Sequence, residues 1–348
     1  MDRPRPPGRA GGGRGGDVPE RVALLQNWLG RELGLTDFTL EPASGDASFR
    51  RYFRLTLPDG TTRIAMDAPP EQEDCRPFVA LARAFEAIGL HVPHIYSEDL
   101  EQGFLLLSDL GSCLYLDALD DETVGRLYGD ALGALAVIQA CGPREGLPPY
   151  DRALLMQEME LFREWLVREQ LGLALQEEER LMLDRTFELL IASALEQPRV
   201  CVHRDYHSRN LLVTSSPNPG ILDFQDAVVG PVTYDLVSLL RDCYIRWPRE
   251  QVAQWAMNYY LLALQSGVLR VEHEEQFLRW FDLMGVQRHL KAAGIFARLN
   301  RRDGKPGYLK DIPRTLGYIV ELAPDYTELA ELGSFIEQRV LPALRGSG

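Results

Sequence analysis

The sequence has no excess of positive charge. Its 348 residues include 37 Lys and Arg against 51 Asp and Glu, for a formal net charge of −14 at pH 7. Broad binding to nucleic acids or to anionic membranes requires a basic face. We therefore expect neither a nucleic-acid partner nor a membrane partner, although the net charge does not describe the chemistry of any single site.

Long apolar runs and cysteine pairs are also missing. No stretch approaches the about 18 consecutive apolar residues of a membrane-spanning helix, and the N-terminus has no apolar core behind its charges. These absences predict a cytoplasmic protein. The five cysteines are scattered and contain no C-x-x-C pair, so we expect reduced thiols rather than a metal site or disulfides. They are Cys75, Cys113, Cys141, Cys201 and Cys243.

The remaining composition is that of a folded protein with two lobes. Hydrophobic residues make up 45% of the chain, and its length is sufficient for two substantial cores. Residues 1–17, rich in Pro, Gly and Arg, are predicted to be a disordered tail. Residues 18–111 show a helix, a hairpin, a second helix and two apolar strands, whereas helical periodicity dominates residues 112–348. We expect an α+β monomer with a small β-rich N-lobe and a larger, mostly helical C-lobe.

The most informative stretch is VHRDYHSRNLLVTSSPNPGILDFQDAVVGPVTYD. A short apolar strand leads into Asp205, with Asn210 five residues later, and a second apolar strand ends at Asp223, 13 residues after Asn210. The order and spacing fit the kinase catalytic loop H-R-D-x-x-x-x-N and the metal-binding D-F that follows it. Phosphoryl transfer needs a carboxylate near the attacking hydroxyl, and a carboxamide with a second carboxylate to hold Mg²⁺ against the nucleotide phosphates. We predict Asp205 for the first role and Asn210 with Asp223 for the second.

This stretch resembles the aminoglycoside phosphotransferase-like kinases, in which a segment similar to GPVTYDLVSLLRDCY follows the catalytic block. Together with GIFARLNRRDGKPGYLKDIPRTL, it resembles more narrowly the bacterial N-acetylmuramate/N-acetylglucosamine anomeric kinases of cell-wall recycling. The resemblance extends from about Val22 to near the C-terminus. It implies a bilobal protein-kinase-like fold, ATP and Mg²⁺ as cofactors, and phosphorylation of the C1 hydroxyl of a small amino sugar. His203 and Asp235 are expected to support the loop backbone.

Nucleotide contacts are expected in the N-lobe. Small residues before the hairpin would leave backbone N–H groups exposed to the ATP phosphates. The stretch consists of Ser44, Gly45, Asp46, Ala47 and Ser48. The second apolar strand resembles the hinge between kinase lobes, whose backbone groups would bind the adenine edge. The hinge candidates are Leu107, Ser108 and Asp109.

The N-lobe has no lysine. Protein kinases place a lysine in V-A-I-K to pair with the nucleotide phosphates, but the matching stretch here is RIAMDAP, and the whole chain has only Lys291, Lys305 and Lys310. Either an arginine supplies the charge or Mg²⁺ and backbone donors suffice. The arginine candidates are Arg50, Arg51 and Arg63. Strand alternation predicts that Arg50 and Arg51 point to opposite faces.

The acceptor site is predicted from charge. N-acetylmuramate carries a lactyl carboxylate, which calls for an unpaired cation near Asp205, whereas a polycationic aminoglycoside calls for an acidic site. The basic segment LNRRDGKPGYLKD favours an anionic or neutral sugar. The candidates are Arg209, Arg241, Arg288 and His289, followed by Arg298, Arg301 and Lys310.

Two alternatives stay open from the sequence. One is a kinase acting on an aminoglycoside or another alcohol. The other is a nucleotide-binding regulator without turnover, which the missing lysine and the DFQ in place of DFG would permit. The sequence does not decide between the two amino sugars, or between the anomers.

Overall fold

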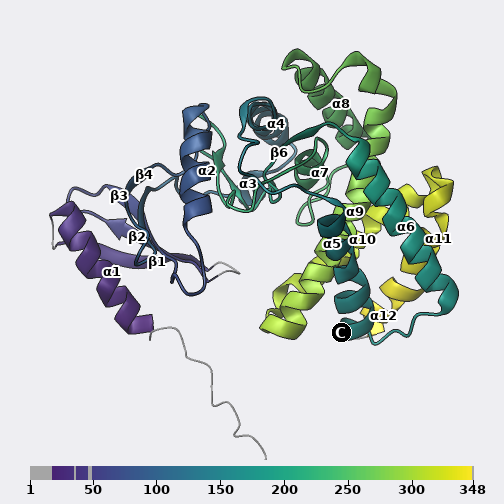
Figure 1. The fold of residues 1–348 in the computed structure, drawn as a ribbon, viewed down its shortest axis with the longest axis horizontal. Coiled ribbons are helices and arrows are strands. Elements are labelled where there is room, and N and C mark those ends of the chain that lie inside the picture. The colour runs from purple at the N-terminus through teal and green to yellow at the C-terminus, as the bar shows by residue number, and fades with distance from the viewer. Residues whose placement is uncertain (1–17, 35–36, 46–48, 347–348) are drawn as a thin grey trace, which may run out of the picture. The chain divides into compact units, whose positions relative to one another are not determined.

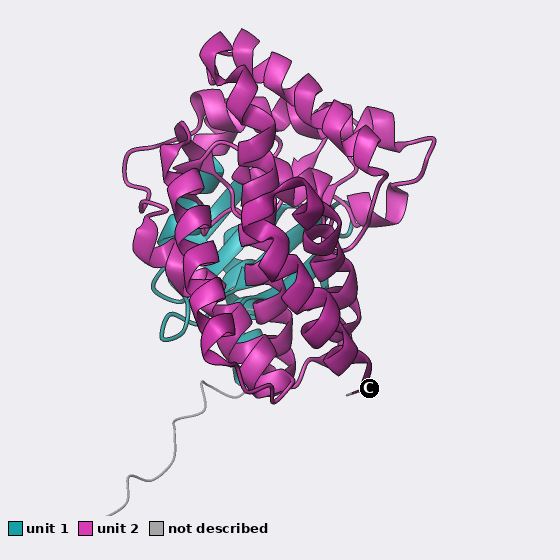
Figure 2. Ribbon diagram, turned by 90° about the vertical axis from the view of Figure 1, so that its right-hand side faces the viewer, with its two compact units in different colours: residues 1–83, 93–109 teal, residues 84–92, 110–348 magenta. Residues whose placement is uncertain are grey.

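The computed structural model describes residues 18–34, 37–45 and 49–346. They form two compact units, coloured separately in Figure 2. The first contains the described residues up to Arg83 together with Pro93–Asp109, and the second contains Ala84–Val92 and the described residues from Leu110 onward. The predicted disordered tail, residues 1–17, lies outside the described residues.

An antiparallel five-stranded sheet forms the first unit, in the order β1-β2-β3-β5-β4. Its strands are β1 (Thr39–Gly45), β2 (Arg51–Thr56), β3 (Thr62–Asp67), β4 (Ile95–Asp99) and β5 (Phe104–Ser108). The predicted hairpin is confirmed as β2 and β3, which pair from Arg51 with Asp67 to Thr56 with Thr62. The Pro-Asp-Gly turn closes it, because Asp59 accepts the Thr61 N–H at 2.9 Å.

Helix α1 (Val18–Leu33) covers the sheet of the first unit (Figure 1). Its sequence places apolar side chains at helical spacing, and Leu25, Trp28 and Leu29 are buried. These side chains form one core with Leu55, Ala65, Phe104 and Leu106 of the strands. The second predicted helix is α2 (Arg76–Ala87), whose last residues belong to the second unit.

Helices make up most of the second unit (Figure 1). They are α3 (Tyr115–Ala118), α4 (Val124–Cys141), α5 (Arg152–Leu161) with its π-helical continuation η1 (Phe162–Gln170), α6 (Glu177–Glu196), α7 (Tyr234–Leu240), α8 (Arg249–Gln265), α9 (Glu274–Asp303), α10 (Ile312–Leu322), α11 (Ala330–Phe335) and α12 (Leu341–Gly346). Helix α9 packs against α5, α6, α7, α8 and α10 and is central to the unit. Two short antiparallel strand pairs complete it: β6 (Arg199–Val202) with β9 (Val228–Pro231), and β7 (Leu211–Leu212) with β8 (Gly220–Ile221).

Helix α7 is shorter than its periodicity predicts. The sequence predicts a helix over residues 234–246, but α7 ends at Leu240 and Arg241 leaves helical geometry with φ −117° and ψ 52°. The Asp242 carboxylate accepts the N–H of Tyr244 at 2.9 Å and that of Ser208 at 2.9 Å. These bonds stabilise a turn in place of further helix, because an aspartate that bonds nearby backbone competes with helical hydrogen bonding.

Gly294 lies where α9 closely approaches the backbone at the junction between α5 and η1. A Cβ atom there would lie 2.3 Å from the carbonyl carbon of Leu161. A backbone atom cannot rotate away as a side chain can, so only glycine fits without a shift of one helix.

We expect Gly294→Ala to lower the free energy of unfolding by about 1–3 kcal/mol through overpacking. Gly133→Ala in α4 is the matched control, because a Cβ there meets nothing within 4 Å. That substitution should raise stability by about 0.5–1 kcal/mol through helix propensity. Urea unfolding of both variants checks the prediction, which equal effects in the two variants would contradict.

Candidate active site

The two strand pairs of the second unit bring the predicted catalytic groups together. Residues 203–210 connect β6 to β7, and Asp223 lies two residues after β8. Because Leu211 pairs with Ile221, the ends of β7 and β8 are adjacent. The Leu222 N–H donates to the Asn210 carbonyl at 2.9 Å and continues this pairing toward the site.

Asn210 lies between the other two predicted groups. Its side-chain amide donates to the backbone carbonyl of Asp205 at 3.0 Å and to the Asp223 carboxylate at 3.4 Å. Gln225, the third residue of DFQ, donates its side-chain amide to the other Asp223 oxygen. The structure therefore brings Asp205, Asn210 and Asp223 together, and the glutamine that replaces the DFG glycine contacts the same carboxylate.

Asn210 and Asp223 have the donor chemistry of a magnesium site. Mg²⁺ prefers hard oxygen ligands and is commonly bound through one or two carboxylates together with substrate phosphates. Among the described residues, no group of three His, Cys, Asp or Glu side chains is placed to hold a metal. Asn210 and Asp223 offer one amide oxygen donor and one carboxylate, which fit a Mg²⁺ ion that takes further ligands from substrate phosphates.

His203 links the two halves of the site. Its Nε2 lies 2.9 Å from the Leu222 carbonyl, and its Nδ1 lies 3.2 Å from the backbone N of Asp205. Since Nδ1 accepts from an amide, the proton must be on Nε2 and the imidazole is neutral. Burial agrees, because it lowers the pKa of His203 to about 4. His203 therefore supports the loop and does not donate charge to it.

Asp235 holds the start of the catalytic loop. This buried carboxylate at the start of α7 accepts the N–H of His203 at 2.6 Å and that of Arg204 at 2.9 Å. Arg204 has a φ of 77°, which is costly for a residue with a Cβ. Burial raises the pKa of Asp235 to about 7, against the opposing effect of the two amide donors. Asp242 holds the far end of the loop, since it accepts both the N–H and the hydroxyl of Ser208.

Glu158 is a central residue that the sequence analysis missed. This α5 carboxylate, 4% exposed, binds the Arg204 guanidinium and lies 3.0 Å from the Lys291 ammonium. Tyr150 donates its hydroxyl to it, and Lys291 also donates to the Tyr234 hydroxyl at 2.8 Å. Although burial alone would raise it, the pKa of Glu158 is lowered by the charges of Lys291 and Arg204.

A signal for this cluster was present in the sequence. Glu158 lies at helical spacing from Leu155 and Phe162, so its position on the apolar face of α5 is visible from periodicity. Lys291 is one of only three lysines and lies in the apolar run HLKAAG. A charged residue on an apolar helix face needs a partner. The partner itself is not visible, because 133 residues separate the two positions.

The cluster also affects Asp205. Burial tends to raise the pKa of Asp205, but the charges of Lys291 above all, and then of His207 and Arg288, outweigh this effect, and the pKa is lowered. Asp205 is therefore ionised at neutral pH. Within the part of the chain that the structure describes, no protein group donates a hydrogen bond to its carboxylate, which leaves both oxygens for a ligand.

Arg209 lies on an aromatic surface beside the loop. Its guanidinium carbon is 3.8 Å from the centre of the Tyr244 ring and 5.8 Å from that of Tyr308. The Phe296 ring lies between these two, at 6.0 Å from Tyr244 and 5.6 Å from Tyr308. We call Tyr244, Phe296 and Tyr308 the aromatic wall. Arg209 is half-buried, and among the described residues no carboxylate pairs with it.

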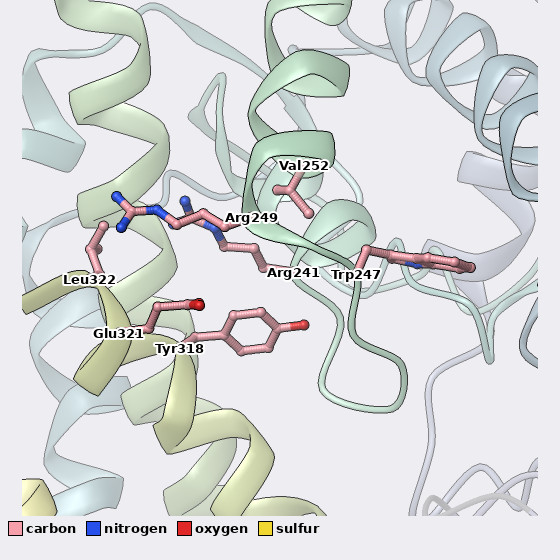
Figure 3. Close-up of a pocket in the computed structure, with 7 residues that line it drawn as sticks. All are labelled: Arg241, Trp247, Arg249, Val252, Tyr318, Glu321 and Leu322. Carbon is pink, nitrogen blue, oxygen red and sulfur yellow. The ribbon is translucent and has the colours of Figure 1, made fainter. Parts of the chain in front are cut away.

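The other acceptor candidates differ in their surroundings. Arg241 pairs with Asp282 and lines a small recess with Tyr318 and Glu321 (Figure 3). His289 bonds the Arg241 carbonyl at 2.9 Å and stacks on Tyr318, and burial lowers its pKa to about 3. Both side chains are thus already engaged by other residues of the second unit, and their role in substrate binding stays a prediction. Arg288 is buried and forms no salt bridge with a carboxylate among the described residues. Arg301 and Lys310 are exposed, and Arg298 is half-buried.

The predicted nucleotide residues lie in the first unit or outside the described residues. Ser44 and Gly45 end β1, while Asp46, Ala47 and Ser48 are among the residues that the structure does not describe. Leu107 and Ser108 lie in β5, between β3 and β4. The Ser108 N–H already donates to the His94 carbonyl at 2.9 Å, and the Asp109 carboxylate binds Arg54. The nucleotide contacts stay a prediction.

The N-lobe arginines are engaged within the first unit. Arg50 pairs with Glu73 at 3.1 Å, and Arg51 pairs with Asp67 at the end of β3. Arg63 lies over the Tyr96 ring at 4.0 Å. These contacts do not select a substitute for the missing lysine.

Sequence comparison identifies related proteins along most of the chain. The profile described as "Phosphotransferase enzyme family" matches residues 39–281. An N-acetylmuramate/N-acetylglucosamine kinase of Pseudomonas putida is 50% identical over 334 residues, which cover 92% of this chain and 98% of that protein. One of Neisseria meningitidis is 42% identical over 325 residues, covering 92% and 96%.

Solved structures share the fold at low sequence identity. A spectinomycin phosphotransferase in complex with ADP and spectinomycin superposes with a TM-score of 0.62 at 12% identity, over 91% of this chain and 98% of that one. A choline kinase from Streptococcus pneumoniae gives 0.60 at 12%, over 86% and 98%. The expected protein-kinase-like α+β fold is confirmed.

The sequence predicts no membrane-spanning helix. Among the helices of the described residues, none combines the length and the apolar character that crossing a bilayer requires.

Glu158→Gln should lower the free energy of unfolding by about 3–5 kcal/mol, because it leaves the cations of Arg204 and Lys291 buried without a full counter-charge. Glu188→Gln is the control, since Glu188 pairs with Arg152 at the surface, and it should leave stability nearly unchanged. Chemical denaturation of the two variants tests this, and losses of similar size would show that Glu158 is not the centre of the cluster.

Acid should destabilise the protein through His203. Its folded pKa of about 4 lies below the about 6.5 of an unfolded histidine. Between these values the unfolded chain takes up a proton that the folded chain does not, so the free energy of unfolding falls as pH falls, by at most about 3 kcal/mol. His203→Asn should flatten the dependence between pH 7 and 4.5, whereas His94→Asn, at an exposed position, should not. Parallel curves for wild type and His203→Asn would refute this.

Proposed function

The chain belongs to the phosphotransferase enzyme family, and from this premise we propose that it transfers the γ-phosphoryl group of ATP to the C1 hydroxyl of N-acetylmuramate and N-acetylglucosamine. The observation that carries the proposal is the placement of Asp205 beside Asn210 and Asp223, in a chain whose relatives at 42–50% identity are named for these two sugars. We assign the reaction to recycling of cell-wall amino sugars, as the sequence resemblance implies.

Asp205 orients the sugar hydroxyl in this proposal. Its carboxylate is ionised and free of protein donors among the described residues, so it can accept the hydroxyl hydrogen. In a loose phosphoryl-transfer transition state the hydroxyl proton leaves late, and alignment of the oxygen with the γ-phosphorus matters as much as basicity. The rigid loop from His203 to Asn210 supplies that alignment.

Asn210 and Asp223 would hold Mg²⁺ through their side-chain oxygens, after Asn210 and Gln225 release their present amide contacts with Asp223. Bound there with ATP, the metal neutralises charge that develops on the phosphates. Asp223 has a φ of 60°, which aspartate tolerates better than most residues. In this conformation the Asp223 carboxylate lies 3.4 Å from the side-chain amide nitrogen of Asn210.

The acceptor side of Asp205 favours a sugar that is neutral or anionic. Arg209 and Arg288 place two cations near the catalytic loop without carboxylate partners among the described residues. Asp242, which could attract a cationic substrate, already accepts three hydrogen bonds from Ser208 and Tyr244. The aromatic wall offers an apolar face for a sugar ring. A polycationic aminoglycoside would meet repulsion here.

ADP release with Mg²⁺ and ATP tests the proposal across N-acetylmuramate, N-acetylglucosamine, their C1-methyl glycosides and kanamycin. We expect turnover of both free sugars and of neither glycoside, because methylation removes the attacking hydroxyl. Asp205→Asn should lower kcat by about 10²- to 10⁴-fold and leave ATP binding intact, since Asn210 and Asp223 remain.

Other results would each reject part of the proposal. Turnover of the methyl glycosides would exclude C1 as the acceptor position. Turnover of kanamycin alone would exclude the amino sugars. Bound ATP without turnover of any acceptor, together with an Asp205→Asn variant that behaves as wild type, would favour a nucleotide-binding regulator.

A further inference from the structure

Arg288 is a buried cation without a counter-ion. The side chain extends from α9, is 6% exposed, and makes one polar contact, from Nη1 to the Cys243 sulfur at 3.6 Å. Its Nε is buried and has no hydrogen-bond partner. Within the described residues, no carboxylate forms a salt bridge with it. Burial of a charge without a hydrogen-bonded counter-ion is unfavourable, so an anion that reached Arg288 would stabilise it.

Comparison with the other buried cations shows that Arg288 is unusual. The buried arginine and lysine side chains among the described residues are Arg50, Arg288 and Lys291. Arg50 pairs with Glu73 and Lys291 pairs with Glu158. Lys291 lies on the same helix only three residues from Arg288, so the absence of a partner for Arg288 is not a general property of this part of α9.

The protein carboxylates near Arg288 are committed to other groups. Burial tends to lower the pKa of Arg288, but the charges of surrounding groups, among them Asp205 and Asp242, raise it. Asp242 uses its oxygens for Ser208 and Tyr244, and Asp205 is the proposed hydroxyl-orienting group. A second orphan atom lies nearby, because His207 Nδ1 is buried without a partner and the charge of Arg288 acts on that ring.

The contacts of Arg288 place it beside the proposed acceptor site rather than among the proposed metal ligands. Its polar contact is with Cys243, which directly precedes Tyr244 of the aromatic wall. No hydrogen bond among the described residues connects it to Asn210 or Asp223. An anion that reaches Arg288 would therefore come from the acceptor. A carboxylate suits it best, because the planar guanidinium can donate two parallel hydrogen bonds to one carboxylate.

We propose that Arg288 binds the lactyl carboxylate of N-acetylmuramate and thereby sets the preference of this enzyme for an acidic over a neutral amino sugar. The inference rests on the proposed function, whose acceptor it specifies. With the neutral N-acetylglucosamine, Arg288 stays unpaired and contributes nothing to binding.

Steady-state kinetics of Arg288→Gln with the two sugars tests the inference. Loss of a charge-assisted, two-pronged contact should lower kcat/KM for N-acetylmuramate about 10- to 100-fold and change that for N-acetylglucosamine by less than about 3-fold. Arg288→Lys should fall between wild type and Arg288→Gln, since it keeps the charge but not the fork. Arg279→Gln is the control: this α9 residue pairs with Glu328 at the surface, and its loss should affect neither sugar.

A change in the substrate provides the matching test without a change in the fold. The neutral amide of N-acetylmuramate should be as poor a substrate for wild type as the acid is for Arg288→Gln, and the two changes together should cost little more than either alone. Equal turnover of acid and amide by wild type would overturn the proposal even if Arg288→Gln failed to fold.

The remaining outcomes separate this inference from the proposed function. An equal fall of kcat/KM for both sugars in Arg288→Gln would assign the residue to the phosphoryl group or to loop positioning and refute the carboxylate contact. No fall for either sugar would refute it as well. Failure of wild type to phosphorylate either sugar would reject the proposed function and this inference with it, because turnover of N-acetylglucosamine does not require the Arg288 contact.

Discussion

The buried carboxylate of Glu158 is the group on which the active site depends. It binds the guanidinium of Arg204, which lies in the catalytic loop, and the ammonium of Lys291, which lies on the central helix α9. The three charges cannot be buried separately, because each would then lose its hydration without compensation. Packing of α5 against α9 therefore decides whether the loop can keep its conformation, and Lys291, held in place by Glu158, helps to keep Asp205 ionised.

The same loop is held at its backbone. Asp235 accepts two amides at its start, Asp242 accepts an amide and a hydroxyl near its end, and His203 connects it to the strand before Asp223. Fixed groups of this kind contribute to phosphoryl transfer because they need no reorganisation when charge develops. The left-handed conformation of Arg204 indicates that these contacts outweigh local strain.

Charge near the site differs in sign from charge on the whole chain. The protein carries a net charge of −14, yet Arg209 within the loop and Arg288 beside it lack carboxylate partners among the described residues. The contrast between Arg288 and the neighbouring Lys291 separates two uses of a buried cation. Lys291 is neutralised within the fold and supports it. Arg288 remains available to a ligand, at a cost to stability that a bound anion would offset.

The sequence by itself determined the two-lobe α+β organisation, the hairpin of β2 and β3, and the order and spacing of Asp205, Asn210 and Asp223, the proposed catalytic triplet. These features depend on local periodicity and on fixed spacing within one segment. Tertiary structure alone decided that α7 stops at Leu240 and that Glu158 neutralises the buried charges of Arg204 and Lys291. It also decided that Lys291 has a carboxylate partner whereas Arg288 has none among the described residues. Those outcomes depend on which side chains meet between segments that are far apart in the chain. The packing of α9 against its neighbours determines these contacts, and a local sequence pattern does not reveal them.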